Sequence, residues 1–469
     1  MDASDFRRLG HAFVDWVADY RERLADLPVR SQVAPGDIRA RFSRTPPANG
    51  GQIDQALAIL QRDVLPGITH WNHPSFFAYF PGNTSYASIL ADLAASGLGA
   101  QGMSWETSPA ATEVEEVTID WLRQMLGLPP GFEGVIHDTA STATLCALLC
   151  ARERALGFAG GGLQGAPAAL TVYASDQAHS SIEKAVRLAG FGSDHLRLVP
   201  TDDQHALRPD ALAKLLAEDR AAGHRPCAIV ATTGTTATTA FDPVAACAEL
   251  AIAYGAWLHV DAAMAGSAML LPECRSLWHG VERADSMVMN PHKWLGVGFD
   301  CSAYFVRDAQ HLVRVMGTNP SYLRTARDQE VKNLRDWGIP LGRRFRALKL
   351  LFVLLDAGVD GLQAQLRRHL QLAQWLTQRI DAAADWQRLA PVPLQTLCVR
   401  HRPAGIDEAA LARHNLAIVQ RINESGRAYL TATVLKGVQA LRVSIGAERT
   451  TLREVEALWA ELQAAARQP

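Results

Sequence analysis

The sequence Asn290-Pro291-His292-Lys293-Trp294 follows the apolar run Ser286-Met287-Val288-Met289 and precedes the glycine-punctuated Leu295-Gly296-Val297-Gly298. The apolar run predicts a buried strand, and the glycines predict a turn. Lys293 therefore lies at a strand end among apolar neighbours, where desolvation lowers the pKa of an ammonium group. Such an amine can form a Schiff base with an aldehyde. A lone lysine in this setting is more often an exposed residue that follows an edge strand.

A carboxylate at the end of a second predicted strand favours the chemical interpretation. The apolar run from Tyr254 to Val260 leads into Asp261-Ala262-Ala263. In open α/β sheets, ligands bind at the carboxyl ends of the strands. A lysine that forms a Schiff base and an aspartate that faces a pyridinium nitrogen are what pyridoxal 5′-phosphate (PLP) requires. The pair Asp261 and Lys293 therefore predicts a PLP enzyme.

The composition limits the classes of protein to which this chain can belong. The 469 residues are 48% hydrophobic and 20% charged, which suits two or three soluble globular domains. The net charge of −2 argues against a nucleic-acid partner. The first residues lack the basic and apolar regions of a secretory signal, and no run approaches 18 apolar residues, so we expect neither a signal peptide nor a membrane span. The seven cysteines are scattered, which favours reduced thiols in a cytoplasmic protein and no metal site.

Strand and helix patterns alternate between Ser85 and about Asp360. This alternation predicts an α/β fold with a mostly parallel sheet sandwiched by helices. Strands are expected at 170–173, 196–199, 227–231, 257–260, 285–289 and 301–306, and helices at 179–189, 209–218 and 243–254. From about Gly361 to Pro469, short strand and helix patterns predict a smaller α/β domain.

The N-terminal part predicts two amphipathic helices, one from Phe6 to Tyr20 and one from about Ile53 to Val64. A small unit with two apolar faces cannot bury both alone, so we expect it to pack on a second subunit. The aromatic, proline-bounded segment from His70 to Pro81 comes next. It is either core packing beneath a loop or a wall of a ligand pocket, and composition favours neither.

Three polar clusters lie at strand–helix junctions. Asp138 to Thr144 precedes the apolar helix from Leu145 to Arg152; its hydroxyls are ordinary N-caps, or Ala140 and Ser141 bind an anion such as a cofactor phosphate. His179 is a polar cap or a satisfied buried group, or it is a ring that stacks on the cofactor and reaches the substrate carboxylate. Thr236, in the hydroxyl-rich segment 232–239, belongs to a β-turn or binds the cofactor's phenolic side.

Taken together, these motifs resemble the group II PLP-dependent amino-acid decarboxylases, in particular the aromatic-L-amino-acid (DOPA-type) decarboxylases and especially the bacterial ones. The resemblance covers nearly the whole chain. The phrases that carry it are His70-Trp71 through Tyr79-Phe80-Pro81, Thr139-Ala140-Ser141, Asp176-Gln177-Ala178-His179-Ser180-Ser181, His259-Val260-Asp261-Ala262-Ala263, Asn290-Pro291-His292-Lys293-Trp294 and Pro340-Leu341-Gly342-Arg343-Arg344-Phe345-Arg346.

The resemblance implies a fold-type I homodimer with its active site at the subunit interface, and three parts: an N-terminal segment (1–84), a PLP-binding domain (85–360) and a C-terminal domain (361–469). It implies roles residue by residue. Catalytic roles fall to Lys293, Asp261, His179 and Tyr322; cofactor contacts to Ala140, Ser141, His179, Thr236, Asp261, Ala263, Asn290, His292 and Lys293; and substrate contacts to Trp71, Phe80, Gly82, Gln101 and Met103.

The implied activity is that of a carboxy-lyase, which converts an aromatic L-amino acid to its amine and CO2. Tyr322 matches the tyrosine of a catalytic loop that protonates Cα, whereas a phenylalanine there favours aldehyde formation. Family members commonly have a hydroxyl residue where this chain has Gly82, and more apolar residues at Gln101 and Met103. The alternatives are a decarboxylase of glutamate or histidine, an aldehyde synthase, and a cofactor-binding protein without turnover.

Overall fold

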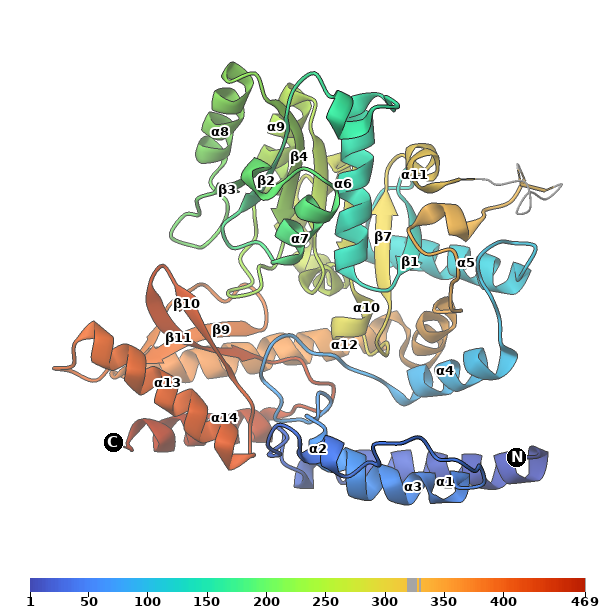
Figure 1. The fold of residues 1–469 in the computed structure, drawn as a ribbon. Coiled ribbons are helices and arrows are strands. Elements are labelled where there is room, and N and C mark those ends of the chain that lie inside the picture. Colours follow the sequence, from blue (N-terminus) through green and yellow to red (C-terminus); the bar gives the residue numbers. More distant parts are fainter. Residues whose placement is uncertain (319–326, 329, 469) are drawn as a thin grey trace. The chain divides into compact units, whose positions relative to one another are not determined.

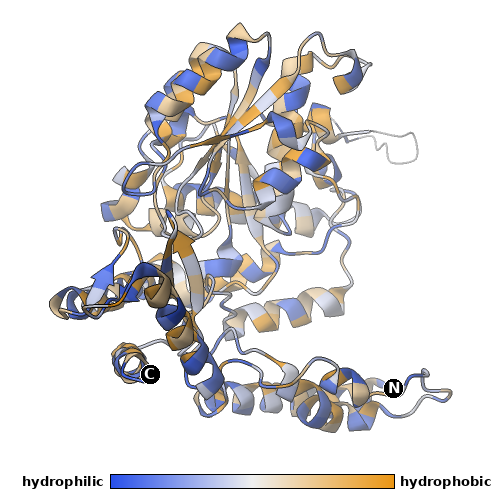
Figure 2. Cartoon of the chain, turned by 60° about the vertical axis from the view of Figure 1, so that its left-hand side comes forward, coloured by the Kyte–Doolittle hydropathy of each residue, from blue (hydrophilic) through white to orange (hydrophobic). Residues whose placement is uncertain are grey.

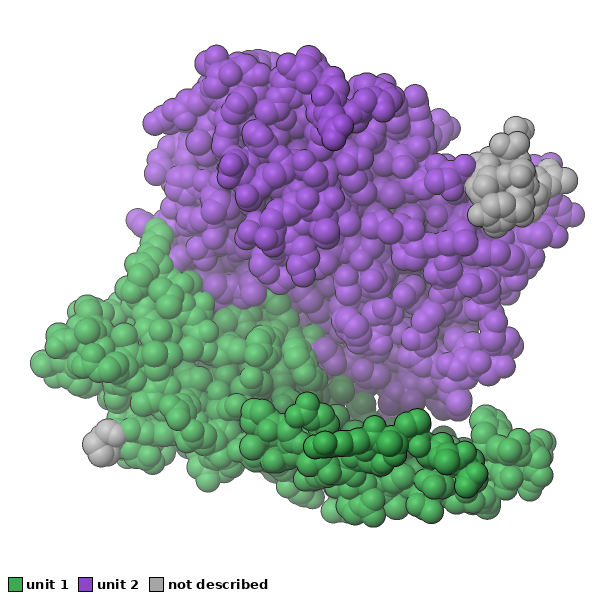
Figure 3. Space-filling view, viewed as in Figure 1, with its two compact units in different colours: residues 1–81, 372–389, 397–469 green, residues 82–371, 390–396 purple. Residues whose placement is uncertain are grey.

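The computed structural model describes residues 1–318, 327–328 and 330–468 (Figure 1). The chain forms two compact units (Figure 3): a small unit of residues 1–81, 372–389 and 397–469, and a large unit of residues 82–371 and 390–396. Within the described residues, none of the helices is long and apolar enough to cross a membrane. The expected three-part division of the chain stays a prediction.

The large unit is built on a seven-stranded sheet of order β1-β7-β6-β5-β4-β2-β3. Strands β6, β5, β4, β2 and β3 pair in parallel, and β7 is antiparallel to both of its neighbours. This confirms the predicted mostly parallel sheet. The strands are β1 (Glu133–His137), β2 (Leu170–Ser175), β3 (Leu196–Val199), β4 (Arg225–Thr232), β5 (Trp257–Asp261), β6 (Ser286–Met289) and β7 (Ser302–Val306).

Helices cover both faces of this sheet. Right-handed crossovers place α6 (Ala140–Leu156) and α7 (Ser181–Leu188) on one face, in front of the strands in Figure 1. They place α8 (Pro209–Ala221) and α9 (Val244–Tyr254) on the other face. Every residue of β2 and β5 is buried, because a parallel strand between two helical layers has no solvent face. The carboxyl ends of these strands consequently form one well-supported edge.

The remaining helices of the large unit flank the sheet or follow it. They are α4 (Tyr86–Leu98), α5 (Pro109–Leu126), α10 (Pro291–Trp294) and α11 (Ala309–Met316). The long α12 (Ala347–Ala382) runs from this unit into the small one and leaves helical geometry at Gly358, which has φ 60° and ψ 179°.

The small unit combines the two ends of the chain. Its sheet has the order β10-β11-β9-β8, with antiparallel pairs β10–β11 and β8–β9. Its elements include α1 (Ala3–Glu22), α2 (Asp37–Ala40), β8 (Trp386–Arg388), β9 (Thr396–His401), α13 (Glu408–Ser425), β10 (Thr431–Leu435), β11 (Val438–Ser444) and α14 (Leu452–Ala466). Hydrophobic and hydrophilic residues alternate around the N-terminal helices in Figure 2.

The segment from Ile53 to Val64 is helical throughout, as predicted, but it is not one regular α-helix. A 3-10 turn (Ile53–Gln55) leads into the short α3 (Ala56–Ile59), and a π-helical turn (Leu60–Val64) follows. Pro66 has no N–H to donate to the carbonyl of Arg62, four residues earlier. The Arg41 guanidinium binds that carbonyl instead, at 2.8 Å.

Candidate active site

Lys293 lies one helical turn beyond the end of β6. Asn290 is the N-cap of α10, and its backbone N–H donates to the carbonyl of Ala263 at 2.8 Å. The Lys293 N–H in turn donates to the Asn290 carbonyl at 3.0 Å. Pro291 occupies the first helical position, where its missing N–H costs no hydrogen bond. The lysine backbone is therefore tied to the residues that follow β5.

Asp261 is the last residue of β5 and is 4% exposed. It pairs with Thr232 of β4 and Val288 of β6, which also lie at the carboxyl ends of their strands. One carboxylate oxygen accepts a hydrogen bond from the backbone N–H of Ala263 at 3.1 Å. A buried charge held in this way interacts strongly with any cation placed opposite it, because the local dielectric is low.

His179 lies between β2 and α7 and is solvent-exposed in the isolated chain. Its Nδ1 accepts the backbone N–H of Ser181 at 3.1 Å and lies 2.8 Å from the Ser181 hydroxyl. These bonds assign the ring proton to Nε2. Partial burial lowers the pKa of His179, the Asp261 carboxylate raises it, and the Lys293 and Lys184 ammonium groups lower it. The charges of Asp261 and Lys293 thus both act on this one ring.

The N-terminus of α6 opens at the same edge of the sheet. Within the described residues, no side chain caps this helix, whereas Ser85, Ser108 and Asp308 cap α4, α5 and α11. Ala140 is the first helical residue and Ser141, the second, is exposed. Uncapped N–H groups and the helix dipole attract anions.

Two further predicted residues are buried beside Lys293. His292 accepts the backbone N–H of Cys301 on Nδ1 at 2.9 Å, which leaves the proton on Nε2. Burial, together with the charge of Lys293, lowers the pKa of His292 to about 4, so the ring is neutral at physiological pH. The Asn290 side-chain oxygen accepts the Ser302 hydroxyl at 2.6 Å.

Four other predicted residues lie outside the helices and strands of the large unit. Thr236 is exposed in a turn after β4, and Ala263 is half-buried. The Gln101 amide oxygen accepts the backbone N–H of Arg343 at 2.7 Å, and the half-buried Met103 accepts the N–H of Arg335 on its carbonyl at 2.8 Å.

The remaining predicted residues belong to different parts of the chain. Trp71 and Phe80 belong to the small unit, where the Trp71 ring stacks on Tyr79 at 5.5 Å between centroids. Gly82 is the first residue of the large unit. Tyr322 lies outside the described residues.

Sequence reasoning missed two residues that support the site. The Asn83 amide donates to the carbonyl of Lys293 at 3.3 Å and is fully buried. Ser302, at the start of β7, fixes the Asn290 side chain. Asn83 directly follows Gly82, so the polar segment after Pro81 was the available signal for it, whereas Ser302 gives no signal in the sequence.

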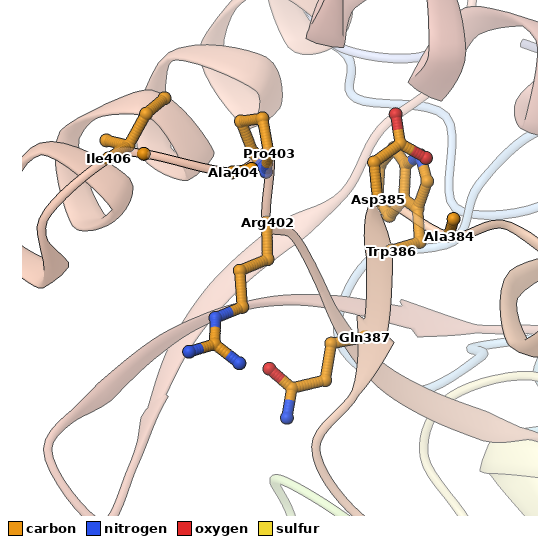
Figure 4. Close-up of a pocket in the computed structure, with 9 residues that line it drawn as sticks. Ala384, Asp385, Trp386, Gln387, Arg402, Pro403, Ala404 and Ile406 are labelled. Carbon is orange, nitrogen blue, oxygen red and sulfur yellow. The ribbon is translucent and has the colours of Figure 1, made fainter.

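Another hollow in the structure does not contain these residues. It measures about 700 Å³, lies in the small unit and is lined by Ala384, Asp385, Trp386, Gln387, Arg402, Pro403, Ala404, Gly405 and Ile406. Figure 4 shows the side chains of Arg402 and Gln387 extending toward the same space. None of its lining residues is a predicted site residue.

The donor set at the sheet edge fits PLP. The cofactor needs an anion cradle for its phosphate, an acid opposite its pyridine nitrogen and an amine for its aldehyde. The α6 N-terminus, Asp261 and Lys293 offer these three groups. The neutral, protonated Nε2 of His292 adds a donor suited to a phosphate oxygen.

Comparison with known proteins agrees with this chemistry. Residues 35–401 match the family model described as the pyridoxal-dependent decarboxylase conserved domain. The chain is 40% identical to a phenylacetaldehyde synthase of Arabidopsis thaliana (99% of this chain, 96% of the relative) and 40% identical to tryptophan decarboxylase 2 of Oryza sativa subsp. japonica (98% and 94%).

A solved structure is also similar over nearly its whole length. The crystal structure of Oryza sativa TDC with PLP and tryptamine superposes with a TM-score of 0.97 at 37% identity, and the match covers 99% of this chain and 98% of that one. These relatives are plant proteins, so the expected likeness to bacterial members stays a prediction. On the family match and the identities to full-length relatives, the chain belongs to the pyridoxal-dependent decarboxylase family, whose cofactor is PLP.

Proposed function

We propose that the protein decarboxylates an aromatic L-amino acid to the corresponding amine and CO2. The observation that carries the proposal is the position of Asp261 and Lys293 at the carboxyl ends of the neighbouring strands β5 and β6, where the Asn290 N–H donates to the Ala263 carbonyl at 2.8 Å. Similarity to a tryptophan decarboxylase and to a phenylacetaldehyde synthase supports an aromatic substrate. DOPA, tryptophan, tyrosine, phenylalanine and 5-hydroxytryptophan are the candidates.

The residues that would hold PLP divide by the part of the cofactor they suit. The N–H groups of Ala140 and Ser141 suit the phosphate, together with Asn290 and His292. Asp261 suits the pyridine nitrogen and Thr236 the phenolic oxygen side, while His179 and Ala263 suit the two faces of the ring. When bound through Lys293, PLP supplies the electron sink that accepts the electrons of the breaking bond between Cα and the carboxylate.

Asp261 and His179 have complementary roles in this proposal. A buried carboxylate at position 261 holds the proton on the pyridine nitrogen. His179 has a lowered pKa, so its ring is neutral and adds no positive charge of its own beside that site. Its Nε2–H stays available to position the substrate carboxylate or to relay a proton.

Tyr322 is proposed to deliver the proton to Cα, with His179 as the relay partner in that step. A tyrosine at this position supports decarboxylation, because the family resemblance implies that a phenylalanine there favours aldehyde formation. The substitution Tyr322→Phe is therefore expected to raise aldehyde and ammonia at the expense of amine. An unchanged product ratio would remove Tyr322 from the role of proton donor.

Substrate contacts are proposed for Trp71, Phe80, Gly82, Gln101 and Met103. Gly82 offers no hydroxyl to a catechol, so a polar ring contact would have to come from a neighbour. The Gln101 amide oxygen already accepts the Arg343 N–H, which means that a substrate contact from Gln101 would come from its amide NH2.

We further propose a homodimer, on the basis of an apolar stripe along α4. Tyr86, Leu90 and Leu93 are 42%, 51% and 52% exposed and lie on one helix face by their spacing. Exposed apolar stripes of this kind mark protein–protein interfaces. The double variant Leu90→Glu/Leu93→Glu is expected to be monomeric by light scattering, whereas Val434→Glu, at an equally exposed site on β10, is expected to leave the dimer intact.

A panel of L-amino acids tests the reaction. Incubation of the PLP-loaded protein with each one, with CO2, amine, ammonia and peroxide measured together, separates a decarboxylase from an aldehyde synthase. Glutamate and histidine belong in the panel as the alternative substrates. Lys293→Ala is the control and should show no turnover. Binding of PLP without any turnover in the wild-type protein would favour a non-catalytic role. A cytoplasmic location stays a prediction.

A further inference from the structure

Arg442 is a buried arginine in the middle of β11, in the small unit. It is 4% exposed, and burial lowers the pKa of its guanidinium to about 10, so the group stays cationic at neutral pH. The guanidinium donates to the carbonyl of Tyr79. It also lies 4.6 Å from the centre of the Phe80 ring, in a cation–π contact.

Several other contacts hold the same segment against the strands of the small unit. The N–H of Phe77 donates to the Tyr429 carbonyl at 3.0 Å, and its carbonyl accepts the Ser444 N–H at 2.9 Å. A Cβ at Gly446 would meet Cγ of Pro81 at 2.6 Å, so the backbone packs directly on the proline. The segment is thus held on both sides of Phe80, whose ring is partly exposed.

A cation on one face of an aromatic ring changes the electrostatic potential of the opposite face. The guanidinium draws π electron density toward itself, so the opposite face of Phe80 becomes less negative. An electron-rich ring then stacks on that face with less repulsion between the two quadrupoles. Electron-poor rings gain less from the same arrangement.

We propose that Arg442 is a positioning residue that determines specificity: from behind Phe80, it favours substrates with electron-rich rings, such as indole, phenol and catechol, over electron-poor rings. The inference rests on the proposed function, because it requires Phe80 to contact the substrate ring. It narrows the set of candidate aromatic substrates by the electron density of their rings.

A series of ring-fluorinated analogues of the best aromatic substrate tests this inference, because each fluorine withdraws electron density from the ring. In the wild-type enzyme, kcat/KM should fall with each added fluorine. In Arg442→Met the series should be flat, with KM for the parent substrate raised about tenfold and kcat within about twofold. Arg442→Lys keeps a cation beside the ring and should retain the fall.

Two controls separate this role from a structural one. Arg21 is equally buried in the same unit and pairs with Glu448 at 3.4 Å, so Arg21→Met should lower stability without changing the fluorine series. Phe80→Leu should flatten the series by itself, and adding Arg442→Met should flatten it no further, since the arginine acts through that ring.

A fluorine series that falls as steeply in Arg442→Met as in the wild type would overturn the inference and leave the proposed function standing. If Arg442→Met does not fold, Phe80→Leu decides, and a fall that persists without the ring overturns the inference. If the wild-type enzyme turns over no aromatic L-amino acid, the proposed function and this inference fail together.

Discussion

The indole N–H of Trp294 donates a hydrogen bond to Nδ1 of His369, 2.9 Å away, and the two rings lie nearly parallel at an interplanar angle of 14°. Both side chains are fully buried. Trp294 directly follows Lys293 and ends α10, whereas His369 belongs to α12. The bond therefore fixes the backbone of Lys293 to a long helix within the same unit.

Trp294→Phe keeps the apolar packing and removes the donor. The buried His369 acceptor then loses this bond, which should lower the free energy of unfolding by about 1–3 kcal/mol. Because Lys293 loses its anchor, we also expect the covalent link to PLP to form more slowly. Visible absorbance measures the rate of this reaction. Tyr173→Phe is the matched control, since it removes a buried hydrogen bond of 2.6 Å to Asp219. A control that slows the covalent link equally would contradict the anchoring role.

The buried His259 should make stability fall at acidic pH. Its Nδ1 lies 2.9 Å from the Ser286 hydroxyl, and burial, partly opposed by the Asp261 charge, lowers its pKa to about 4. An unfolded histidine titrates near pH 6.5, so the unfolded chain binds the proton first. The stability is full above pH 6.5 and is lost as the pH falls toward 4.

Urea unfolding at pH 7.5 and pH 5 measures this effect. Between these values the wild-type protein should lose about 1–2 kcal/mol more than His259→Gln, which has no group to titrate there. Above pH 7, the free energies of unfolding of the two proteins should change with pH by similar amounts. Equal losses in both would mean that other groups produce the acid sensitivity.

Most of the sheet was predictable because its strands are buried on both faces and read as continuous apolar runs. The strand β1 was missed, since Gly134 interrupts its short run. That glycine is required by close packing, because a Cβ there would meet Cγ2 of Ile119 at 2.5 Å. Packing of this kind between distant segments leaves no periodicity in the sequence.

The site was predictable to the extent that its chemistry lies at strand ends. Asp261 ends one apolar run and Lys293 follows another by four residues, so their residue types and positions were enough to pair them. The role of Tyr322 came from the family resemblance alone, and the resemblance chose between the two interpretations of Thr236, because a threonine in a turn has many ordinary explanations. Asn83 and Ser302 contact the site through tertiary structure, which sequence patterns do not encode.

The buried ion pair of Arg343 and Glu115 predicts a strong asymmetry between single and double variants. The guanidinium donates to the carboxylate at 2.7 Å and to the carbonyl of Ile136 at 2.6 Å. Arg343→Met leaves the Glu115 charge buried alone and should cost about 3–5 kcal/mol of stability. Adding Glu115→Leu should recover part of that loss. The exposed pair of Arg367 and Glu273, also 2.7 Å apart, is the control, and Arg367→Met should cost less than about 1 kcal/mol.

Thermal unfolding of these four proteins is sufficient to check the asymmetry. A double variant less stable than Arg343→Met would show that Glu115 stabilises the fold without its partner. Its bond from the backbone N–H of Ile136, at 2.8 Å, would then be the interaction that matters.

Ser141→Asp should move stability and cofactor affinity in opposite directions. Position 141 is in the first turn of α6, where the structure describes no side-chain cap. An added carboxylate there interacts favourably with the helix dipole, so the PLP-free protein should gain about 0.3–1 kcal/mol of stability. The same carboxylate repels a dianionic phosphate, so the affinity for PLP should fall by about tenfold or more.

Ser141→Asn separates the two effects, because it has a similar size and no charge. It should leave the stability of the PLP-free protein nearly unchanged and weaken PLP binding less than the aspartate does. Equilibrium dialysis gives the affinity and urea unfolding the stability. If Ser141→Asp bound PLP as tightly as the wild type, the phosphate would have to lie elsewhere. A full negative charge within the first helical turn must repel a phosphate that is bound to the N–H groups of that turn.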